Sequence, residues 1–371
     1  MKPKVVIVGC GVVGAMIAYE LSTQAAEVCV IDKHQPAQGS TGAALGVLMG
    51  VISHKVKGRT WRLREASIYR YRSLINELQQ QGYSVPFNTQ GIVSLCFDEG
   101  KLPRWHSLKE KRAAQGWPLE IWSPSELKER CSHIELESKF KTEDGDQVIR
   151  SVAAAIYSPA DAQVHPAQLT RALVSAAQKQ GVRFFFDTEV TSLEVSQNRC
   201  IGVQTTEKLV ADWVILSAGL GAAGLSKISA DPLELMPVLG QAMEIQLQAE
   251  VGDRAFQPVI NGDDIQFVPL GDNRYWLGAT VEFPEGNSPV IAKADGLKNL
   301  QQTAARYCSA IAQADVLNTW SGLRPRPVGQ PAPVIKSLGA IDNLILATGH
   351  YRNGVLLAPA TAQAVREKLE L

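Results

Sequence analysis

Apolar and polar positions at the start of the chain follow the pattern of a strand, a helix and a second strand. Residues 4–8 and 27–31 are short β-branched runs, and residues 15–23 between them have a helical pattern. A parallel βαβ unit has this order and about this length, roughly 30 residues. The chain is therefore predicted to open with two parallel strands joined by a helix.

The rest of the chain separates into helical and strand-rich stretches. Helices are predicted at residues 61–81, 102–130, 166–180, 295–314 and 355–369. Strands are predicted at residues 87–97, 182–186, 189–195, 200–206, 209–216 and 344–347, with a strand-rich stretch at 238–281. Turns are predicted at Asn261-Gly262, at Gly271-Asp272 and within residues 139–150. Mixed α/β material recurs at 166–220 and 342–369. This order predicts an α/β fold, with a Rossmann-like domain assembled from separated segments and an inserted antiparallel-sheet α+β domain.

The first predicted turn carries a glycine motif. Gly9, Gly11 and Gly14 form a GxGxxG pattern between the first strand and its helix. Such glycines allow a tight turn, a close approach of the backbone to a pyrophosphate, and close packing of helix on strand. Asp32 ends the second strand, where a carboxylate accepts ribose hydroxyls and disfavours the 2′-phosphate of NADP. The motif predicts dinucleotide binding and leaves NAD and FAD open.

Three later segments add candidate chemistry. Ser217-Ala218-Gly219 follows a predicted strand and is either a second backbone approach to a cofactor or an ordinary strand end. Arg324, next to Pro325, either holds a carboxylate in bidentate geometry or forms an interdomain salt bridge. Residues 347–357 have the pattern of a strand, a glycine loop and a helix start. The N–H groups of that helix start can face the electron-rich edge of a reduced flavin.

Composition limits the function classes. The 37 basic and 37 acidic side chains cancel, which argues against nucleic-acid binding. The six cysteines show no metal-ligand or disulfide spacing, so we expect reduced, buried thiols and no metal site. No apolar stretch reaches the ~20 residues of a membrane span, and the N-terminus lacks a signal-peptide pattern. A soluble, cytoplasmic protein is predicted, with a homo-oligomer left open.

Together, these segments resemble the D-amino-acid oxidase family of FAD enzymes, and most closely the glycine oxidases. The resemblance covers residues 4–369. Its most specific stretch is Gly-His-Tyr-Arg-Asn-Gly-Val-Leu-Leu-Ala-Pro-Ala-Thr at 349–361. The other matching segments keep the order of the family and lie at residues 9–14 with Asp32, 39–48, 161–169, 188–190, 217–219, 237–241, 277–280 and 320–325.

The resemblance implies FAD that is bound without a covalent link. It implies an FAD-binding domain formed by residues 1–85, 150–225 and 325–371, and a substrate-binding domain formed by 86–149 and 226–324. It places the following residues at the cofactor: Gly9, Gly11, Val12, Val13, Gly14, Asp32, Lys33, Ser40, Thr41, Ala44, Gly46, Val47, Val190, Ala218, Gly219, Arg324, Arg352, Asn353, Gly354, Val355 and Leu356.

Three residues fall on substrate positions of the family. Arg324 matches the arginine that binds the substrate carboxylate, and Arg352 matches a second arginine of the pocket. Gln266 stands where the glycine oxidases carry a tyrosine that helps to hold this carboxylate. An amide still donates a hydrogen bond but lacks the reach and the ring of a phenol. Phe267 is expected on the opposite face of the strand, so it cannot replace that tyrosine without a bulge.

The implied reaction is oxidative deamination of a small amino acid or secondary amine. Hydride transfer from Cα to flavin N5 would give an imine, which hydrolyses to an oxo acid and ammonia, and O2 or another acceptor would take the electrons. No general base is expected, and His350 is interpreted as a structural histidine. Two alternatives stay open: a dehydrogenase of the same fold that uses a quinone or carrier, and a flavin-binding redox module without turnover.

Overall fold

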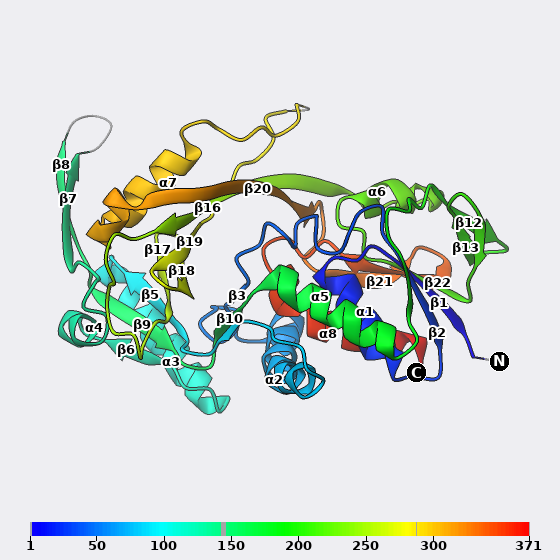
Figure 1. Cartoon of the computed structure of the whole chain (residues 1–371), viewed down its shortest axis with the longest axis horizontal. Coiled ribbons are helices and arrows are strands. Elements are labelled where there is room, and N and C mark those ends of the chain that lie inside the picture. The colour runs from blue at the N-terminus through cyan, green and yellow to red at the C-terminus, as the bar shows by residue number, and fades with distance from the viewer. Residues whose placement is uncertain (1, 142–145, 287, 371) are drawn as a thin grey trace.

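The computed structural model describes residues 2–141, 146–286 and 288–370. Figure 1 shows an elongated molecule with a sheet-and-helix layer at one end and a large antiparallel sheet at the other. The polypeptide passes between the two ends several times, so each sheet is built from segments that are distant in sequence. The mixed α/β class predicted from the sequence is confirmed.

The first sheet has six strands in the order β11-β2-β1-β15-β22-β21. Its strands are β1 (Lys4–Val8), β2 (Glu27–Ile31), β11 (Arg183–Phe185), β15 (Trp213–Leu216), β22 (Ile341–Thr348) and the antiparallel edge strand β21 (Val334–Leu338). The central strands are buried almost throughout, as expected for a parallel sheet covered on both faces. The predicted opening βαβ unit is confirmed, because β1 and β2 pair in parallel around helix α1 (Val12–Ser22).

Helices cover one face of this sheet and a small sheet covers the other. Helix α1 packs against α5 (Pro166–Lys179) and α8 (Gly354–Leu369), and α2 (Gly58–Gln80) packs on α8. The opposite face is covered by β12 (Ser192–Ser196), β13 (Arg199–Gln204) and β14 (Lys208–Val210), with α6 (Gly221–Leu225) nearby. The last helix of the chain therefore lies beside the first.

The second sheet has eight strands in the order β20-β16-β19-β18-β17-β5-β9-β6. Its strands are β5 (Ile92–Cys96), β6 (Glu120–Trp122), β9 (Ala154–Ser158), β16 (Leu235–Gln246), β17 (Val259–Gly262), β18 (Ile265–Gly271), β19 (Arg274–Gly278) and β20 (Asp315–Pro327). All its pairs are antiparallel except β5 with β17. A second apolar core lies on the face covered by α4 (Pro124–Arg130) and α7 (Gly296–Ala305).

The remaining elements lie outside these two sheets. They are β3 (Val47–Leu48), β4 (Phe87–Asn88), β10 (Ala162–Val164), α3 (Leu102–Ala114), the hairpin β7 (Glu137–Lys141) and β8 (Gln147–Ser151), and three 3₁₀ turns at Glu99–Lys101, Ser226–Ile228 and Ser309–Gln313. No helix in the described part of the chain is long and apolar enough to cross a membrane. All six cysteines are buried and unpaired.

Several predicted boundaries are wrong for local reasons. The helix predicted at 102–130 is broken, because the chain turns at Gly116 with φ +79°, forms β6, and starts α4 with a capping box of Ser123 and Glu126. The helix predicted at 295–314 ends at Ala305 and gives way to a 3₁₀ turn. The predicted turn within 139–150 includes the two arms of a hairpin, and residues 142–145 lie outside the described part.

Two predicted hairpin turns are displaced along the chain. Asn261-Gly262 lies in β17, and the turn falls at Asp263 and Asp264, which take φ of +54° and +62°. The second turn falls at Asp272-Asn273 rather than Gly271-Asp272. Aspartate and asparagine tolerate the left-handed region through local side-chain hydrogen bonds. An aspartate pair therefore takes the place of the glycine at the first turn.

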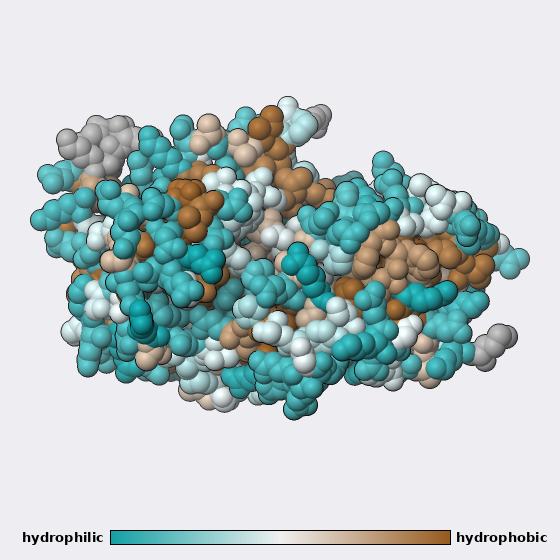
Figure 2. Space-filling view, viewed as in Figure 1, coloured by the Kyte–Doolittle hydropathy of each residue, from teal (hydrophilic) through white to brown (hydrophobic). Residues whose placement is uncertain are grey.

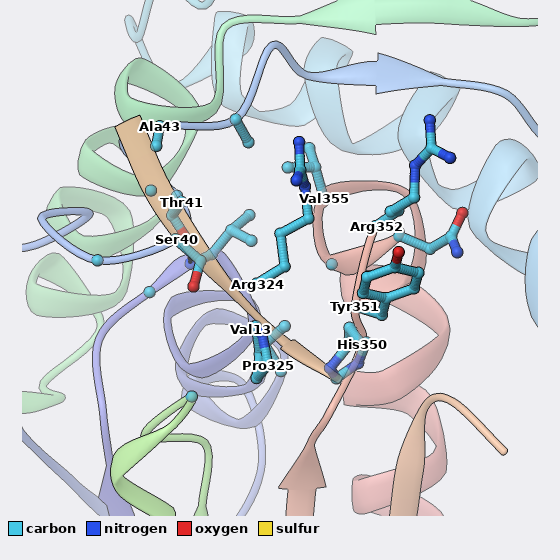
Figure 3. A pocket seen from close by; sticks show the side chains of 18 of the residues that line it. Val13, Ser40, Thr41, Ala43, Arg324, Pro325, His350, Tyr351, Arg352 and Val355 are labelled. Carbon is cyan, nitrogen blue, oxygen red and sulfur yellow. Dashed lines mark hydrogen bonds between the residues drawn. The ribbon is translucent and has the colours of Figure 1, made fainter. Parts of the chain in front are cut away.

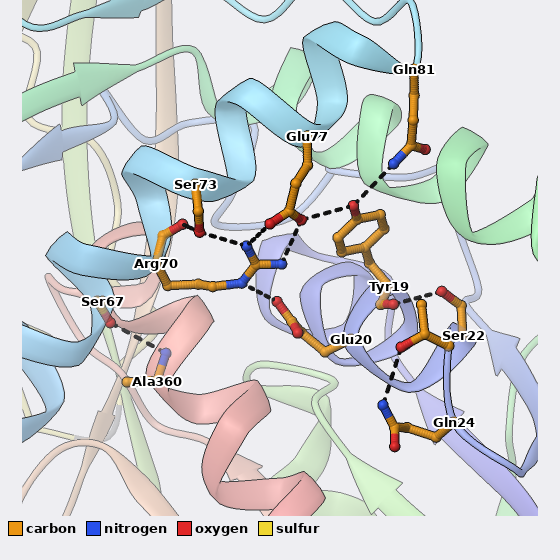
Figure 4. Close-up of polar contacts among 11 residues, drawn as sticks. Tyr19, Glu20, Ser22, Gln24, Ser67, Arg70, Ser73, Glu77, Gln81 and Ala360 are labelled. Carbon is orange, nitrogen blue, oxygen red and sulfur yellow. Dashed lines mark hydrogen bonds and ion pairs between the residues drawn. The ribbon is translucent and has the colours of Figure 1, made fainter.

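A charged cluster fastens α2 to α1 (Figure 4). Arg70 donates from Nε to Glu20 Oε1 at 2.6 Å and from Nη1 and Nη2 to the carboxylate of Glu77 at 2.6 and 2.9 Å. Tyr19 donates to the same carboxylate at 3.2 Å. The hydrogen bonds from Arg70 lower the pKa of Glu77. The bidentate pair of Arg70 and Glu77 lies within α2 and orients both side chains, and the bonds to Glu20 and from Tyr19 join the two helices.

The outer surface is mainly hydrophilic, with apolar areas in several places (Figure 2). One group of exposed apolar side chains lies on β20 and on the segment before α7: Val281, Phe283, Ile291, Val316, Leu317 and Leu323. β20 is the edge strand of the eight-stranded sheet. A long apolar edge is a surface on which chains can associate. The homo-oligomer left open by the sequence stays a prediction.

Two buried charged residues hold the segment from Gly50 to Lys55. Asp161, 1% exposed, accepts backbone N–H bonds from Gly50, Val51 and Ile52, each at 2.8 Å. Arg112, fully buried, donates to the carbonyl oxygens of three residues of the segment, Val51, Ser53 and Lys55. Its guanidinium lies 3.5 Å from the centroid of the Trp61 ring. Burial lowers the pKa of Arg112 to about 10, so the side chain stays charged at neutral pH.

We expect Arg112→Ala to destabilise the protein by about 3–5 kcal/mol, because it leaves three carbonyl groups without their donor in the interior. The matched control is Arg104→Ala, at an exposed position of the same helix. Urea unfolding should show the loss in the first variant and almost none in the control. Equal stability of the two variants would contradict this account of the segment.

Candidate functional site

A cavity of about 1850 Å³ lies between the two sheets. Its walls come from both ends of the chain and from the segments between them. Every residue that the sequence placed at the cofactor or substrate lines it, with the exception of Gly14. The structure therefore brings together segments more than 300 residues apart.

The turn after β1 is packed against the backbone of β15. Gly9 has φ +104°, and a Cβ added there would lie 2.7 Å from Ala218 Cα. A Cβ on Gly14 would lie 1.9 Å from the carbonyl oxygen of Gly9, so Gly14 serves the packing of α1 and does not line the cavity. Gly11 is the N-cap of α1 and has no side chain to offer. The first N–H groups of α1 thus face a cradle of bare backbone, which fits a pyrophosphate.

Asp32 stands at the end of β2, beside this turn. It accepts from the backbone N–H of Cys10 at 2.5 Å and from that of His34 at 2.9 Å. A carboxylate has about four acceptor positions, so Asp32 retains capacity for ribose hydroxyls. Lys33 and Val190 line the cavity at the same end. This arrangement fits the adenosine half of a dinucleotide.

The glycine-rich segment after β2 crosses to the second sheet. Thr41 Oγ1 accepts from the backbone N–H of Val12 at 3.0 Å, and Ser40 donates to the carbonyl oxygen of Leu323 at 2.6 Å. Gly46 has φ +73°, and a Cβ there would lie 1.8 Å from the carbonyl oxygen of Val164. The segment, which includes Ala44 and continues into Val47, therefore joins the α1 N-terminus to β20.

The C-terminal segment closes the cavity from the opposite side. After β22 the chain turns at Gly349, with φ +66°, and begins α8. The N-cap Asn353 makes no side-chain cap, so the first N–H groups of α8, at Gly354, Val355 and Leu356, lack a side-chain partner. These residues line the cavity together with Ala218 and Gly219. A helix N-terminus in this place favours negative charge on a bound ring.

Arg324 comes from β20 and extends into the cavity (Figure 3). Its Nη1 donates to the carbonyl oxygens of Leu239 and Thr280, both at 3.1 Å. Burial, and secondarily the neighbouring charge of Arg352, lowers the pKa of Arg324. Among the described residues neither arginine forms an ion pair. The two carbonyls hold Arg324 in place and leave Nη2 for an anionic ligand.

Gly240 provides the seat of this guanidinium. A Cβ at position 240 would lie 2.2 to 2.4 Å from Nη2, Cζ and Nη1 of Arg324. The glycine is on β16, directly beside β20. Only a residue without a side chain leaves the guanidinium this position.

His350, in the loop before α8, is a structural histidine as expected. It is 4% exposed, and its Nε2 lies 2.8 Å from Thr361 Oγ1. Burial, with a contribution from Arg59, lowers the pKa of His350 to about 3. The imidazole is therefore neutral at physiological pH.

Gln266 lines the cavity as expected. Its neighbours in the lining were not singled out by the sequence: Gln266 bonds to Asn261, which in turn bonds to Ser94, and Arg64 also lines the cavity. Phe267 points the other way and stacks on Tyr275 with ring centroids 4.1 Å apart. The available signals were a serine inside the apolar strand β5 and Arg64 in the buried stripe of α2.

We expect Gly240→Ala to weaken binding of a carboxylate ligand by about 10- to 100-fold, because it displaces Arg324 from its seat. The fold and the FAD content should stay unchanged, since only a flexible side chain must move. Titration of the holoenzyme with (methylthio)acetate, followed by flavin absorbance, measures the effect. The double variant with Arg324→Leu should bind no more weakly than Arg324→Leu alone. A further loss in the double variant would show that Gly240 acts elsewhere.

We expect the stability advantage of the native protein over His350→Gln to be greatest above pH 7. An unfolded histidine titrates near pH 6.5, so below this pH only the unfolded chain gains a proton and the native state loses about 1.4 kcal/mol per pH unit. The advantage should shrink by about 2 kcal/mol at pH 5, and the loss should continue toward pH 3. Urea unfolding at fixed FAD, with the exposed His106→Gln as control, tests this. A constant difference from pH 7 to pH 5 would contradict it.

Comparison with known proteins gives consistent results. The family model described as FAD dependent oxidoreductase matches residues 4–368. A glycine oxidase of Geobacillus kaustophilus is 27% identical over 99% of this chain and 92% of the relative. The crystal structure of glycine oxidase from the same organism has a TM-score of 0.85 at 26% identity, covering 100% of this chain and 95% of the other.

Other relatives are longer than this chain. The bifunctional protein ThiO/ThiG of Trichormus variabilis is 29% identical over 99% of this chain, and the chain spans about half, 52%, of that relative. The family match nevertheless extends over almost the whole sequence. The chain belongs to the FAD dependent oxidoreductase family, and the FAD expected from its sequence is confirmed.

Proposed function

We propose that the protein oxidises a small, carboxylate-bearing amine or amino acid with FAD as its cofactor. The observation that carries this proposal is Arg324, whose guanidinium stands without an ion-pair partner among the described residues, in the same cavity as the glycine turn. A half-buried cation without a counter-charge is a site for an anionic ligand. The glycine oxidase relatives support the class of substrate.

The cofactor contacts are proposed at the backbone cradle of Gly9, Gly11, Val12 and Val13, with Gly14 as its packing support. Asp32, Lys33 and Val190 would hold the adenosine end, and the segments at 40–47, 218–219 and 352–356 would surround the rest. FAD, when bound, supplies the acceptor for a hydride from the substrate Cα. The free N–H groups at the start of α8 would favour negative charge on its ring.

The proposed role of the arginines is to bind and orient. Arg324 would fix the substrate carboxylate from its anchored position on β20, and Arg352 would add positive charge at the same pocket. A carboxylate held by a rigid cation presents the Cα–H in one direction, which is the geometric requirement of the reaction. His350 is a weak proton acceptor, because burial lowers its pKa to about 3. A general base is not part of the proposal.

The division into domains is also proposed. The six-stranded sheet would form the FAD-binding domain from segments within 1–85, 150–225 and 325–371, and the eight-stranded sheet would form the substrate domain. Two strands of the eight-stranded sheet depart from this division. β9 lies within 150–225, which was predicted for the FAD-binding domain, and β20 continues past residue 324 to Pro327. A cytoplasmic location, an electron acceptor of either kind and a homo-oligomer remain predictions.

We expect anaerobic addition of glycine, sarcosine, racemic alanine or racemic proline to bleach the flavin band of the holoenzyme. Arg324→Leu should lower the apparent affinity for the effective amine by at least about 30-fold, because it leaves the carboxylate without its charged partner. Stopped-flow absorbance measures both effects. Hydrogen peroxide formed per substrate oxidised in air distinguishes an oxidase from a dehydrogenase.

Retention of bound FAD without reduction by any small amino acid or secondary amine would contradict the proposal. That outcome would favour the flavin-binding module without turnover. Equal affinity of Arg324→Leu and the native protein for the same amine would remove the assigned role of the arginine while leaving the activity intact.

A further inference from the structure

One face of the eight-stranded sheet carries a row of paired residues, of which Ser94, Asn261 and Gln266 line the cavity. Across neighbouring strands the paired positions are Ser94, Asn261, Gln266, Gly278, Ala242 and Trp320. Arg324 lies four residues beyond Trp320 on β20 and so shares this face, since alternate residues of a strand point the same way. The middle positions of the row, Gly278 and Ala242, have no side chain or a small one. Arg324 lies toward one end of the row, and the polar residues Ser94, Asn261 and Gln266 lie toward the other.

The polar end is a short chain of hydrogen bonds, which we name the amide wall: Ser94, Asn261 and Gln266. Asn261 Nδ2 donates to Ser94 Oγ at 2.9 Å, and Gln266 Nε2 donates to Asn261 Oδ1 at 2.7 Å. All three residues line the cavity. Their strands lie in the sheet at the opposite end of the molecule from β1 and its glycine turn (Figure 1).

The amide wall is incomplete at Gln266. Its Oε1 is buried and has no hydrogen-bond partner among the described residues. A buried acceptor without a donor is unfavourable, and such groups in native sites are satisfied by a ligand or by water. The side-chain amides of Asn261 and Gln266 could also be oriented with oxygen and nitrogen interchanged. The chain of hydrogen bonds would then persist, and the free group of Gln266 would be an N–H. A hydroxyl satisfies either arrangement because it both donates and accepts.

The surroundings favour a neutral partner. The amide wall itself carries no charge. Two cations that line this part of the cavity are paired, Arg150 with Asp263 at 2.5 Å and Lys101 with Asp98 at 3.9 Å. Arg150 also stacks on Phe97, 3.9 Å from the ring centroid. Asp264 lines the cavity as well and forms no ion pair with the described residues. The hydrogen bond that Gln266 lacks is one that a neutral donor provides.

We propose that the substrate carries a neutral hydrogen-bonding substituent beyond its carboxylate-bearing carbon, and that Gln266 binds it and sets specificity. This inference rests on the proposed function, with Arg324 holding the carboxylate at one end of the row. Substrates are thus larger and more polar than glycine.

The first test measures binding without turnover. The holoenzyme is titrated with (2-hydroxyethylthio)acetate and with (propylthio)acetate, which lack the amine and differ only in the terminal hydroxyl. Flavin absorbance gives the two Kd values. We expect the hydroxyl ligand to bind at least about ten-fold more tightly, since the apolar ligand leaves Gln266 unpaired. Affinities within two-fold of each other would overturn the inference.

The second test locates the preference at Gln266. Gln266→Leu should abolish or reverse it, because an apolar side chain of similar size removes the unpaired acceptor. The matched control is Gln246→Leu on β16, whose amide bonds to the carbonyl oxygen of Asp272 outside the cavity. This control should keep the preference. FAD content of each variant verifies folding, and a preference that survives in Gln266→Leu would overturn the inference.

The third measurement separates the inference from the proposed function. Anaerobic flavin reduction is compared for N-(2-hydroxyethyl)glycine with N-propylglycine, and for racemic homoserine with racemic norvaline. We expect the hydroxyl member to have the higher kcat/KM by about ten-fold in at least one pair. A ten-fold binding preference without any flavin reduction would support the amide wall and refute amine oxidation. Flavin reduction without a preference in either pair would support amine oxidation and refute the role of the amide wall.

Discussion

The structure depends on a contact between bare backbones at the end of β1. Gly9 lies against the backbone of Ser217 and Ala218, and the carbonyl oxygen of Gly9 occupies the place where Gly14 would carry a side chain. Ser217 Oγ donates to that carbonyl at 3.0 Å. These contacts set the positions of β1, α1 and β15 relative to one another. The carboxyl edge of the parallel sheet, where this fold binds its ligands, follows from them.

On the opposite wall of the cavity, glycines again leave space for another group, but that group is a side chain rather than backbone. Gly240 and Gly278 keep the centre of the eight-stranded sheet free of side chains, and Gly240 gives the guanidinium of Arg324 its only place. At the first sheet, missing side chains allow backbone N–H groups to approach a ligand. At the second, they allow one long side chain to lie flat and present its charge. Absence of a Cβ thus serves the packing of elements in one case and the placement of a functional group in the other.

The sequence predicted the parts of the site that depend on local pattern. The glycine turn, Asp32 and the segment at 349–361 each combine a recognisable spacing with a strand end or helix start. The amide wall was not predictable in the same way, because Ser94 and Asn261 meet only through the register of strands far apart in the chain. Asn261-Gly262 even has the composition of a turn. The helix predicted at 102–130 from local pattern is wrong, because the chain turns at Gly116 and a new helix begins at the capping box of Ser123.

The two ends of the cavity therefore differ in what determines them. The proposed cofactor end is formed by backbone groups at turns and helix starts, where glycines such as Gly9 and Gly14 leave no room for a Cβ. The proposed substrate end is formed by side chains on the strands β5, β17, β18 and β20. Gln266 belongs to this end, since its backbone is paired with Asn261 and Gly278 in the sheet while the residue lines the cavity. A common fold and cofactor site are thus compatible with different substrates, and specificity has to be derived from side chains rather than from family membership.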